Sequence, residues 1–196
     1  KTDTQTITGT NNGTITNSAT IQVSGNNNKA VDFQTGSSTS TFLNQGTLIG
    51  GSNAASVQVS TSNQNGATIN TFNNEGIIGN GSSKFGITVW GSDSSKSTIN
   101  NFINSGTISS LNEGVFFQNT TLGSLNNTGT ISSSTYKGVQ ISTGTTIDNF
   151  DNSGKITGGS GNNGIGIDLA TTSNIKTFTN GSNGFISGNK GINLTA

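Results

Sequence analysis

The sequence predicts an all-β protein, folded as a parallel β-helix (a solenoid) of about seven turns with three short strands in each turn. Three observations lead to this prediction: one phrase recurs along the chain, apolar residues hold fixed places within it, and the remaining residues are mostly small and polar. The phrase reads apolar-x-Asn-x-Gly-x-Ile and is most complete within residues 98–109. Self-similarity at a period of about 20–50 residues is typical of repeat architectures, in which each unit packs on its neighbours.

Each copy of the phrase has a small residue as its anchor. The anchors are Ala19, Gly46, Gly76, Gly106, Gly129, Gly154 and Gly184, with spacings of 27, 30, 30, 23, 25 and 30 residues. Glycine is expected there because turns between strands often need positive φ. Residues 1–14 carry no full phrase and are interpreted as an irregular or partial first turn of a single domain, 1–196. Since the chain begins with Lys1 and not with Met, we expect a processed protein or a piece of a longer one.

Three apolar pieces in each unit predict the three strands. The first is one residue that lies four places before the anchor, or six places in the stretched last copy: Ile15, Phe42, Phe72, Phe102, Leu125, Phe150 and Phe178. The second is one residue two places after it: Ile21, Leu48, Ile78, Ile108, Ile131, Ile156 and Ile186. The third is an alternating pair: Val31/Phe33, Val57/Val59, Ile87/Val89, Val115/Phe117, Val139/Ile141, Ile167/Leu169 and Ile192/Leu194. Alternation with a period of two indicates strands with one face inward, so each piece is expected to form an internal column.

An asparagine stands two places after the first apolar residue of every copy: Asn17, Asn44, Asn74, Asn104, Asn127, Asn152 and Asn180. A stacked carboxamide at a turn can donate to the next carboxamide and to nearby backbone, and a buried unpaired amide is costly. We therefore interpret these residues as a structural ladder and not as a ligand site.

Composition and charge exclude several classes of function. Hydrophobic residues make up 27% of the 196 residues, the formal net charge is zero, and the chain contains neither Arg, His nor Cys. The absence of a basic stripe argues against nucleic-acid binding. Without Cys or His the chain lacks thiolate metal ligands, disulfides and the commonest general base. We expect no catalytic residue, no cofactor, no metal site and no membrane-spanning segment.

One acidic pair deserves consideration as an active site. Asp148 and Asp151 flank Phe150, and paired carboxylates carry out glycoside hydrolysis in many enzymes. They occupy positions held by Asn and Ile in other copies, and no base, nucleophile and orienting group converge with them. A polysaccharide lyase or hydrolase is therefore the less favoured alternative.

Aromatic side chains outside the internal columns are candidate surface contacts. If Val115 and Phe117 point inward, Phe116 points outward, and the same parity places Trp90 outside beside Val89. Tyr136 is expected in a turn. Exposed aromatic residues often serve as anchors in interfaces, although each of the three could equally lie over a turn.

The phrase Asn-Phe-x-Asn-x-Gly-x-Ile, followed by Gly-Val/Ile-x-apolar, resembles the repeats of bacterial type V autotransporter passenger domains. The similarity is to vacuolating-cytotoxin-like and adhesin autotransporters and covers roughly residues 15–194. This resemblance implies a right-handed parallel β-helix, export through an outer-membrane barrel, and a location on the bacterial cell surface or outside the cell. No toxin or protease motif of such proteins is carried by any residue here.

The favoured function is that of an adhesin or structural stalk that attaches to a protein or glycan of a host or neighbouring cell. Self-association in cell–cell aggregation and a toxin-like role are the alternatives, and a simple spacer is the next possibility. A convergent set of acids and bases would separate the enzyme from these, and the sequence does not contain one.

Overall fold

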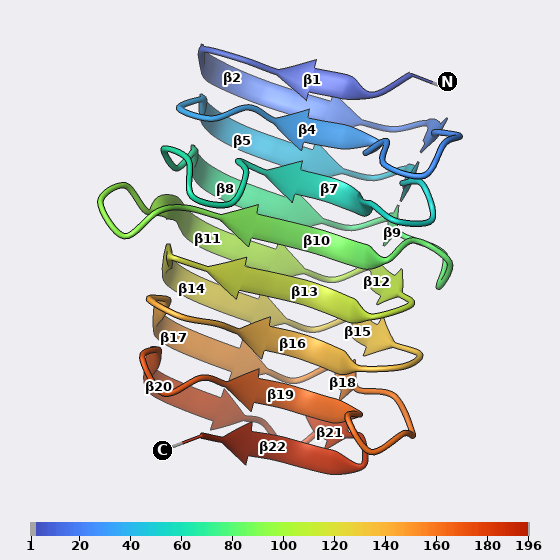
Figure 1. Ribbon diagram of the computed structural model, residues 1–196, viewed down its shortest axis with the longest axis vertical. Coiled ribbons are helices and arrows are strands. Elements are labelled where there is room, and N and C mark those ends of the chain that lie inside the picture. The colour runs from blue at the N-terminus through green and yellow to red at the C-terminus, as the bar shows by residue number, and fades with distance from the viewer. Residues whose placement is uncertain (1–2, 196) are drawn as a thin grey trace.

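The computed structural model describes residues 3–195 as three parallel β-sheets wound into one solenoid, with no helix among these residues (Figure 1). Every strand pairs in parallel with its equivalent one turn later, so the chain advances by one strand spacing per turn. This architecture confirms the predicted parallel β-solenoid of about seven turns with three strands per turn.

The sheets are referred to as A, B and C. Sheet A contains β1 (Gln5–Ile7), β4 (Val31–Phe33), β7 (Ala55–Val59), β10 (Phe85–Trp90), β13 (Glu113–Gln118), β16 (Lys137–Ile141), β19 (Ile165–Leu169) and β22 (Lys190–Leu194). Sheet B contains β2 (Thr10–Asn17), β5 (Ser38–Asn44), β8 (Thr68–Asn74), β11 (Ser97–Asn104), β14 (Thr120–Asn127), β17 (Thr146–Asn152) and β20 (Asn174–Asn180). Sheet C contains β3 (Thr20–Gln22), β6 (Thr47–Ile49), β9 (Ile77–Ile78), β12 (Thr107–Ser110), β15 (Thr130–Ser133), β18 (Lys155–Thr157) and β21 (Phe185–Ser187).

The Phe position of the repeat forms an internal column of sheet B, as predicted. Phe102 is in register with Phe72 on one side and Leu125 on the other, and Phe150 follows Leu125. All four side chains are fully buried, and the Phe72 and Phe102 rings stack with centroids 5.1 Å apart. Each side chain of the column thus covers the side chain of the next turn, and this stacking shields the apolar surface of both from water without a globular core.

Sheet B carries a second internal column that the sequence interpretation did not assign. It lies three residues before the Phe position and consists of Ile69, Ile99, Leu122 and Ile147, all fully buried and in register. Thr39 holds this place one turn earlier. On β8, β11, β14 and β17 this column adds a second buried apolar residue to the one at the Phe position.

The seven asparagines form a continuous ladder of hydrogen bonds at the corner between sheets B and C. Each Nδ2 donates to Oδ1 of the next asparagine, at distances of 2.7 to 2.8 Å from Asn17 through to Asn180. Each amide also donates to the carbonyl of its own anchor residue, as Asn104 does to Gly106 at 3.4 Å. The buried amides are thereby satisfied along the whole stack.

The anchor glycines are required for a reason different from the one expected. The prediction that they adopt positive φ is wrong, because none of them is among the residues with positive φ. Instead, a Cβ at Gly106 would lie 2.1 Å from the carbonyl oxygen of Gly76 on the preceding turn, and a Cβ at Gly46 would lie 2.1 Å from that of Ala19. Close approach of successive turns therefore excludes a side chain. Ala19 lies just before β3, the first strand of sheet C within residues 3–195, so no described turn precedes it in that sheet.

The two ends of the stack differ from its middle. Of the segment expected as an irregular or partial first turn, residues 1–2 lie outside the described residues. The rest contains β1 and the start of β2, with a register shift between Asn11 and Thr14. At the other end the internal columns open to solvent: Phe178 is 38% exposed, Ile192 45% and Leu194 70%.

Candidate functional site

The outward face of sheet A carries one column of residues that is polar except in its middle. In register along the stack, its members are Asp32, Gln58, Thr88, Phe116, Gln140 and Asp168. Inward neighbours such as Ile87, Val89, Val115 and Phe117 fill the core, so the alternation of each strand fixes which residues face outward. The apolar interruption is Phe116 on β13, and Phe85 and Trp90 of β10 lie beside it.

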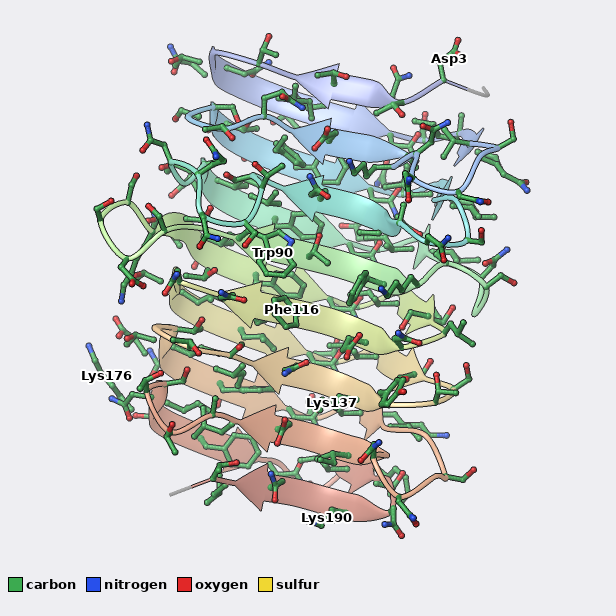
Figure 2. All side chains as sticks on the ribbon, in the orientation of Figure 1. Asp3, Trp90, Phe116, Lys137, Lys176 and Lys190 are labelled. Atoms are coloured by element: carbon green, nitrogen blue, oxygen red, sulfur yellow. The ribbon has the colours of Figure 1, made fainter. Side chains whose placement is uncertain are left out.

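Three aromatic rings gather at this interruption. Trp90 and Phe116 lie on neighbouring strands with ring centroids 4.6 Å apart, and Figure 2 shows them next to each other on the outside of sheet A. Phe85, at the start of β10, lies 6.3 Å from Phe116. The Lys84 ammonium is 5.3 Å from the centroid of the Phe85 ring. We call Phe85, Trp90 and Phe116 the aromatic cluster.

The members of the aromatic cluster differ in their access to solvent. Phe116 faces outward but is only 9% exposed, whereas Trp90 and Phe85 are half-buried. Phe116 thus serves as the base on which the other two rings pack. Tyr136 lies in the turn before β16 and is 38% exposed. Sequence reasoning missed Phe85, whose one signal was a large apolar residue at the position that Glu113 and Lys137 occupy on the next two strands.

A groove of about 270 Å³ lies beside the aromatic cluster. Phe85, Thr88 and Trp90 of β10 border it together with Gln58 of β7. The turns that precede β4 and β7 complete its rim with Asn27, Lys29 and Asn53. Three turns of the solenoid therefore contribute to one concave site, which no single repeat could form.

Thr88 is the unusual residue of this groove. Its side chain is 2% exposed, and its Oγ1 is buried without a hydrogen-bond partner. A buried hydroxyl without a partner is costly and calls for an explanation. Thr88 borders the groove together with Phe85 and Trp90 and is in register with Phe116, and hydrophobic packing alone would favour Val at this position.

Charged groups stand next to the groove but are balanced. Burial raises the pKa of Asp32, and the nearby Lys29 ammonium and a hydrogen bond from Gln34 Nε2 (2.7 Å to Oδ2) oppose this shift. Gln58 Nε2 also lies 3.5 Å from Asp32 Oδ1. The opposite charges of Asp32 and Lys29 therefore offset each other at this side of the site.

A second polar group lies further along sheet A. Lys137 Nζ forms an ion pair with Asp168 at 2.9 Å, and Asn193 Nδ2 donates to the same carboxylate at 2.7 Å. Burial raises the pKa of Glu113 despite the lowering effect of Lys137 and Lys84. One oxygen of Glu113, Oε2, is buried without a hydrogen-bond partner.

The acidic pair considered as an active site is arranged otherwise. Asp148 forms an ion pair with Lys176 at 2.7 Å, with both side chains largely exposed, and Asp151 is an exposed residue of the same strand. Within residues 3–195, no group of three or more acidic residues is placed to hold a metal ion. These carboxylates therefore form a solvated surface feature of sheet B.

Searches with the chain found no matching family model, no similar curated protein and no similar solved structure. A search of the described part of the chain for a helix able to cross a membrane also found none. The structure itself is therefore the basis for the β-solenoid assignment.

Proposed function

We propose that this chain is a binding segment of a bacterial autotransporter passenger, displayed on the cell surface or secreted, which attaches to a molecule of a host or neighbouring cell. The contact surface is the outer face of sheet A around the aromatic cluster and the groove. The observation that carries this proposal is the grouping of Phe85, Trp90 and Phe116 on a sheet face whose central outward column is otherwise polar.

Aromatic residues are uncommon on the outside of this solenoid, and their grouping has no role in the internal columns. Trp90 offers a large, half-buried ring held by Phe116 at 4.6 Å, so little freedom is lost when a partner covers it. Anchors of interfaces are typically such preorganised aromatic residues beside a pocket. The polar residues around the cluster would supply hydrogen bonds at the rim.

The repeat phrase, which resembles those of autotransporter passengers, supports the proposed location. A parallel solenoid suits that role because its stability comes from contacts between neighbouring turns and its faces are long and regular. Within residues 3–195 we find no base, nucleophile and orienting group in mutual contact, so we propose binding without chemical change of the partner.

Retention of the purified chain on cells and on immobilised glycans, measured together with the release of products, tests this proposal. We expect retention without turnover, weakened by Trp90→Ala. The matched control is Phe185→Ala, which removes a 53% exposed aromatic ring from sheet C. Turnover that disappears in an Asp148→Ala, Asp151→Ala double variant would overturn the proposal in favour of a hydrolase or lyase. Absence of retention on every surface would leave the chain as a spacer.

Self-association is the second candidate, because the last turn exposes Phe178, Ile192 and Leu194. Full head-to-tail stacking is hindered, since sheet A has eight strands and sheets B and C have seven. With B and C continuous, β22 and the β1 of a second copy would occupy the same place. Sedimentation of the chain and of a Leu194→Ser variant tests this: a concentration-dependent dimer that the substitution abolishes would support it.

A further inference from the structure

From the groove beside the aromatic cluster we infer a binding site for a neutral saccharide, with a sugar ring on Trp90 and its hydroxyls on the surrounding amides and Thr88. This inference rests on the proposed function and names the class of ligand for the same surface. It is carried by the shape of the groove, the chemistry of its rim and the unpaired hydroxyl of Thr88.

The size of the groove suits a small part of a ligand. Its volume of about 270 Å³ is just below the range of about 300–1,000 Å³ that is usual for small-molecule sites. A ring-sized group can enter it, while the rest of a longer chain would continue along the outside of sheet A.

The lining of the groove combines two kinds of contact. Phe85 and Trp90 present aromatic surface, and Asn27, Asn53 and Gln58 carry carboxamides that can both donate and accept. A pyranose ring has matching properties, since C–H groups cover its faces and hydroxyls that donate and accept surround its edge. Half-buried aromatic faces beside amides therefore fit such a ring better than a purely apolar ligand.

Thr88 provides a separate observation that points to a polar ligand. Its hydroxyl is buried and has no hydrogen-bond partner. The residues in register with it on the neighbouring strands are Gln58 and Phe116, and neither forms a hydrogen bond with it. Burying an unpaired hydroxyl costs stability. Since Oγ1 has almost no accessible surface, a ligand hydroxyl would restore the missing hydrogen bond only with a shift of the side chains that cover it. The site would then discriminate against a ligand that lacks that hydroxyl.

Other ligand classes fit less well. A peptide strand cannot add to sheet A here, because β10 is already paired with β7 and β13. Nucleic acid and acidic polymers need an excess of cations, but the chain has zero net charge and no Arg, and Asp32 opposes the Lys29 charge. A neutral, hydroxyl-rich ligand needs none of these features.

The fluorescence of Trp90 makes the test direct, because it is the one tryptophan of the chain. We would titrate the purified chain with neutral gluco-, manno- and chito-oligosaccharides of two to six units and measure the emission of Trp90. Isothermal titration calorimetry would measure the same binding in Trp90→Ala, Thr88→Val and wild type. Thr177→Val, an exposed threonine of sheet B, and Phe185→Ala are the matched controls.

We expect saturable binding of at least one series, lost in Trp90→Ala and weakened by about tenfold in Thr88→Val, which corresponds to one well-placed hydrogen bond. Both controls should bind as wild type does. Thr88→Val should not lower the urea midpoint, because the hydroxyl it removes has no partner in the folded chain. A variant that bound less only because it unfolded would show a lower midpoint.

Saccharide binding that is unchanged in both groove variants would overturn the assignment of the groove. Retention on cells that survives periodate oxidation of their glycans and disappears after protease treatment would overturn the saccharide class, while the proposed binding function would stand. Loss of retention on every surface would overturn both proposals, so the two failures can be told apart.

Discussion

Removing one amide from the asparagine ladder should destabilise the whole stack, and Asn104→Ala is the most informative change. Asn104 is fully buried, accepts a hydrogen bond from Asn74 at 2.8 Å and donates to Asn127 at 2.7 Å. Its Nδ2 also lies 3.2 Å from the carbonyl oxygen of Thr130. The substitution would leave Oδ1 of Asn127 without its donor inside the protein. Asn74 would keep weaker contacts to the carbonyls of Gly76 and Thr107.

The magnitude follows from these contacts. One buried acceptor without a partner costs about 1–3 kcal/mol, and the net loss of the second amide bond adds roughly 1 kcal/mol. We therefore expect Asn104→Ala to lower the free energy of unfolding by about 2–4 kcal/mol. The control is Ser105→Ala at an exposed neighbouring position, for which a change within about 0.5 kcal/mol is expected. Urea unfolding followed by circular dichroism measures both. Equal midpoints for the two variants would refute the argument that the ladder stabilises the stack.

Three further predictions concern single turns of the solenoid. Gly106→Ala should lower the free energy of unfolding by about 1–3 kcal/mol or more, because its Cβ would meet the Gly76 carbonyl at 2.1 Å; Ala19→Gly should have little effect, and similar urea midpoints for the two would contradict the close-approach argument. Phe102→Ala should cost about 3–5 kcal/mol, whereas Phe178→Ala in the same column, 38% exposed, should cost roughly 1–2 kcal/mol; equal costs would show that the last turn is as well packed as the middle. Burial raises the pKa of Glu113 above its ordinary value of 4.5. The protonated side chain therefore makes its full contribution to the free energy of unfolding below about pH 4.5, and this contribution is lost as the pH rises through the folded-state pKa. Urea midpoints of wild type and Glu113→Gln, compared between pH 3.5 and 7, should diverge in favour of the variant at the higher pH.

The sequence sufficed for the architecture because the repeat has a fixed phase. Once the Phe, Ile and alternating positions are aligned on the anchors, pairing of equivalent strands follows, and the observed register of Phe72, Phe102 and Leu125 agrees. The column of Ile69 and Ile99 was missed although it also recurs. It lies at the start of strands whose apolar signal was assigned to the Phe alone.

The role of the anchor glycines could not be obtained from one turn of sequence. Whether a glycine supplies positive φ or space depends on the distance to the preceding turn, which only the stacked structure gives. The carbonyl of Gly76 occupies the place of a side chain on Gly106, and the exception at Ala19 has the same cause. A repeat alignment shows that a small residue is required but not why.

The candidate site was accessible to sequence reasoning only in part. Strand parity placed Trp90 and Phe116 outside, but the groove also needs Asn27 and Asn53 from turns of irregular length and Phe85 from the start of a strand. Where such connecting segments lie relative to one another depends on the register between neighbouring turns of the solenoid. The alternation of the strand also could not predict that Trp90 and Phe85 cover Phe116 and leave its side chain only 9% exposed.

The solenoid separates the residues that stabilise the fold from those available for recognition. Inward columns and the asparagine ladder contact their equivalents on both sides, so a change there affects several turns. Outward residues contact mainly their neighbours in one sheet and can vary from turn to turn, as Gln58, Thr88, Phe116 and Gln140 do. Because Phe116 is buried beneath its neighbours, its removal would disturb both the stability of the fold and the binding surface. Trp90 is half-buried at the edge of the groove, so a loss of binding in Trp90→Ala with little change in unfolding would report on recognition alone.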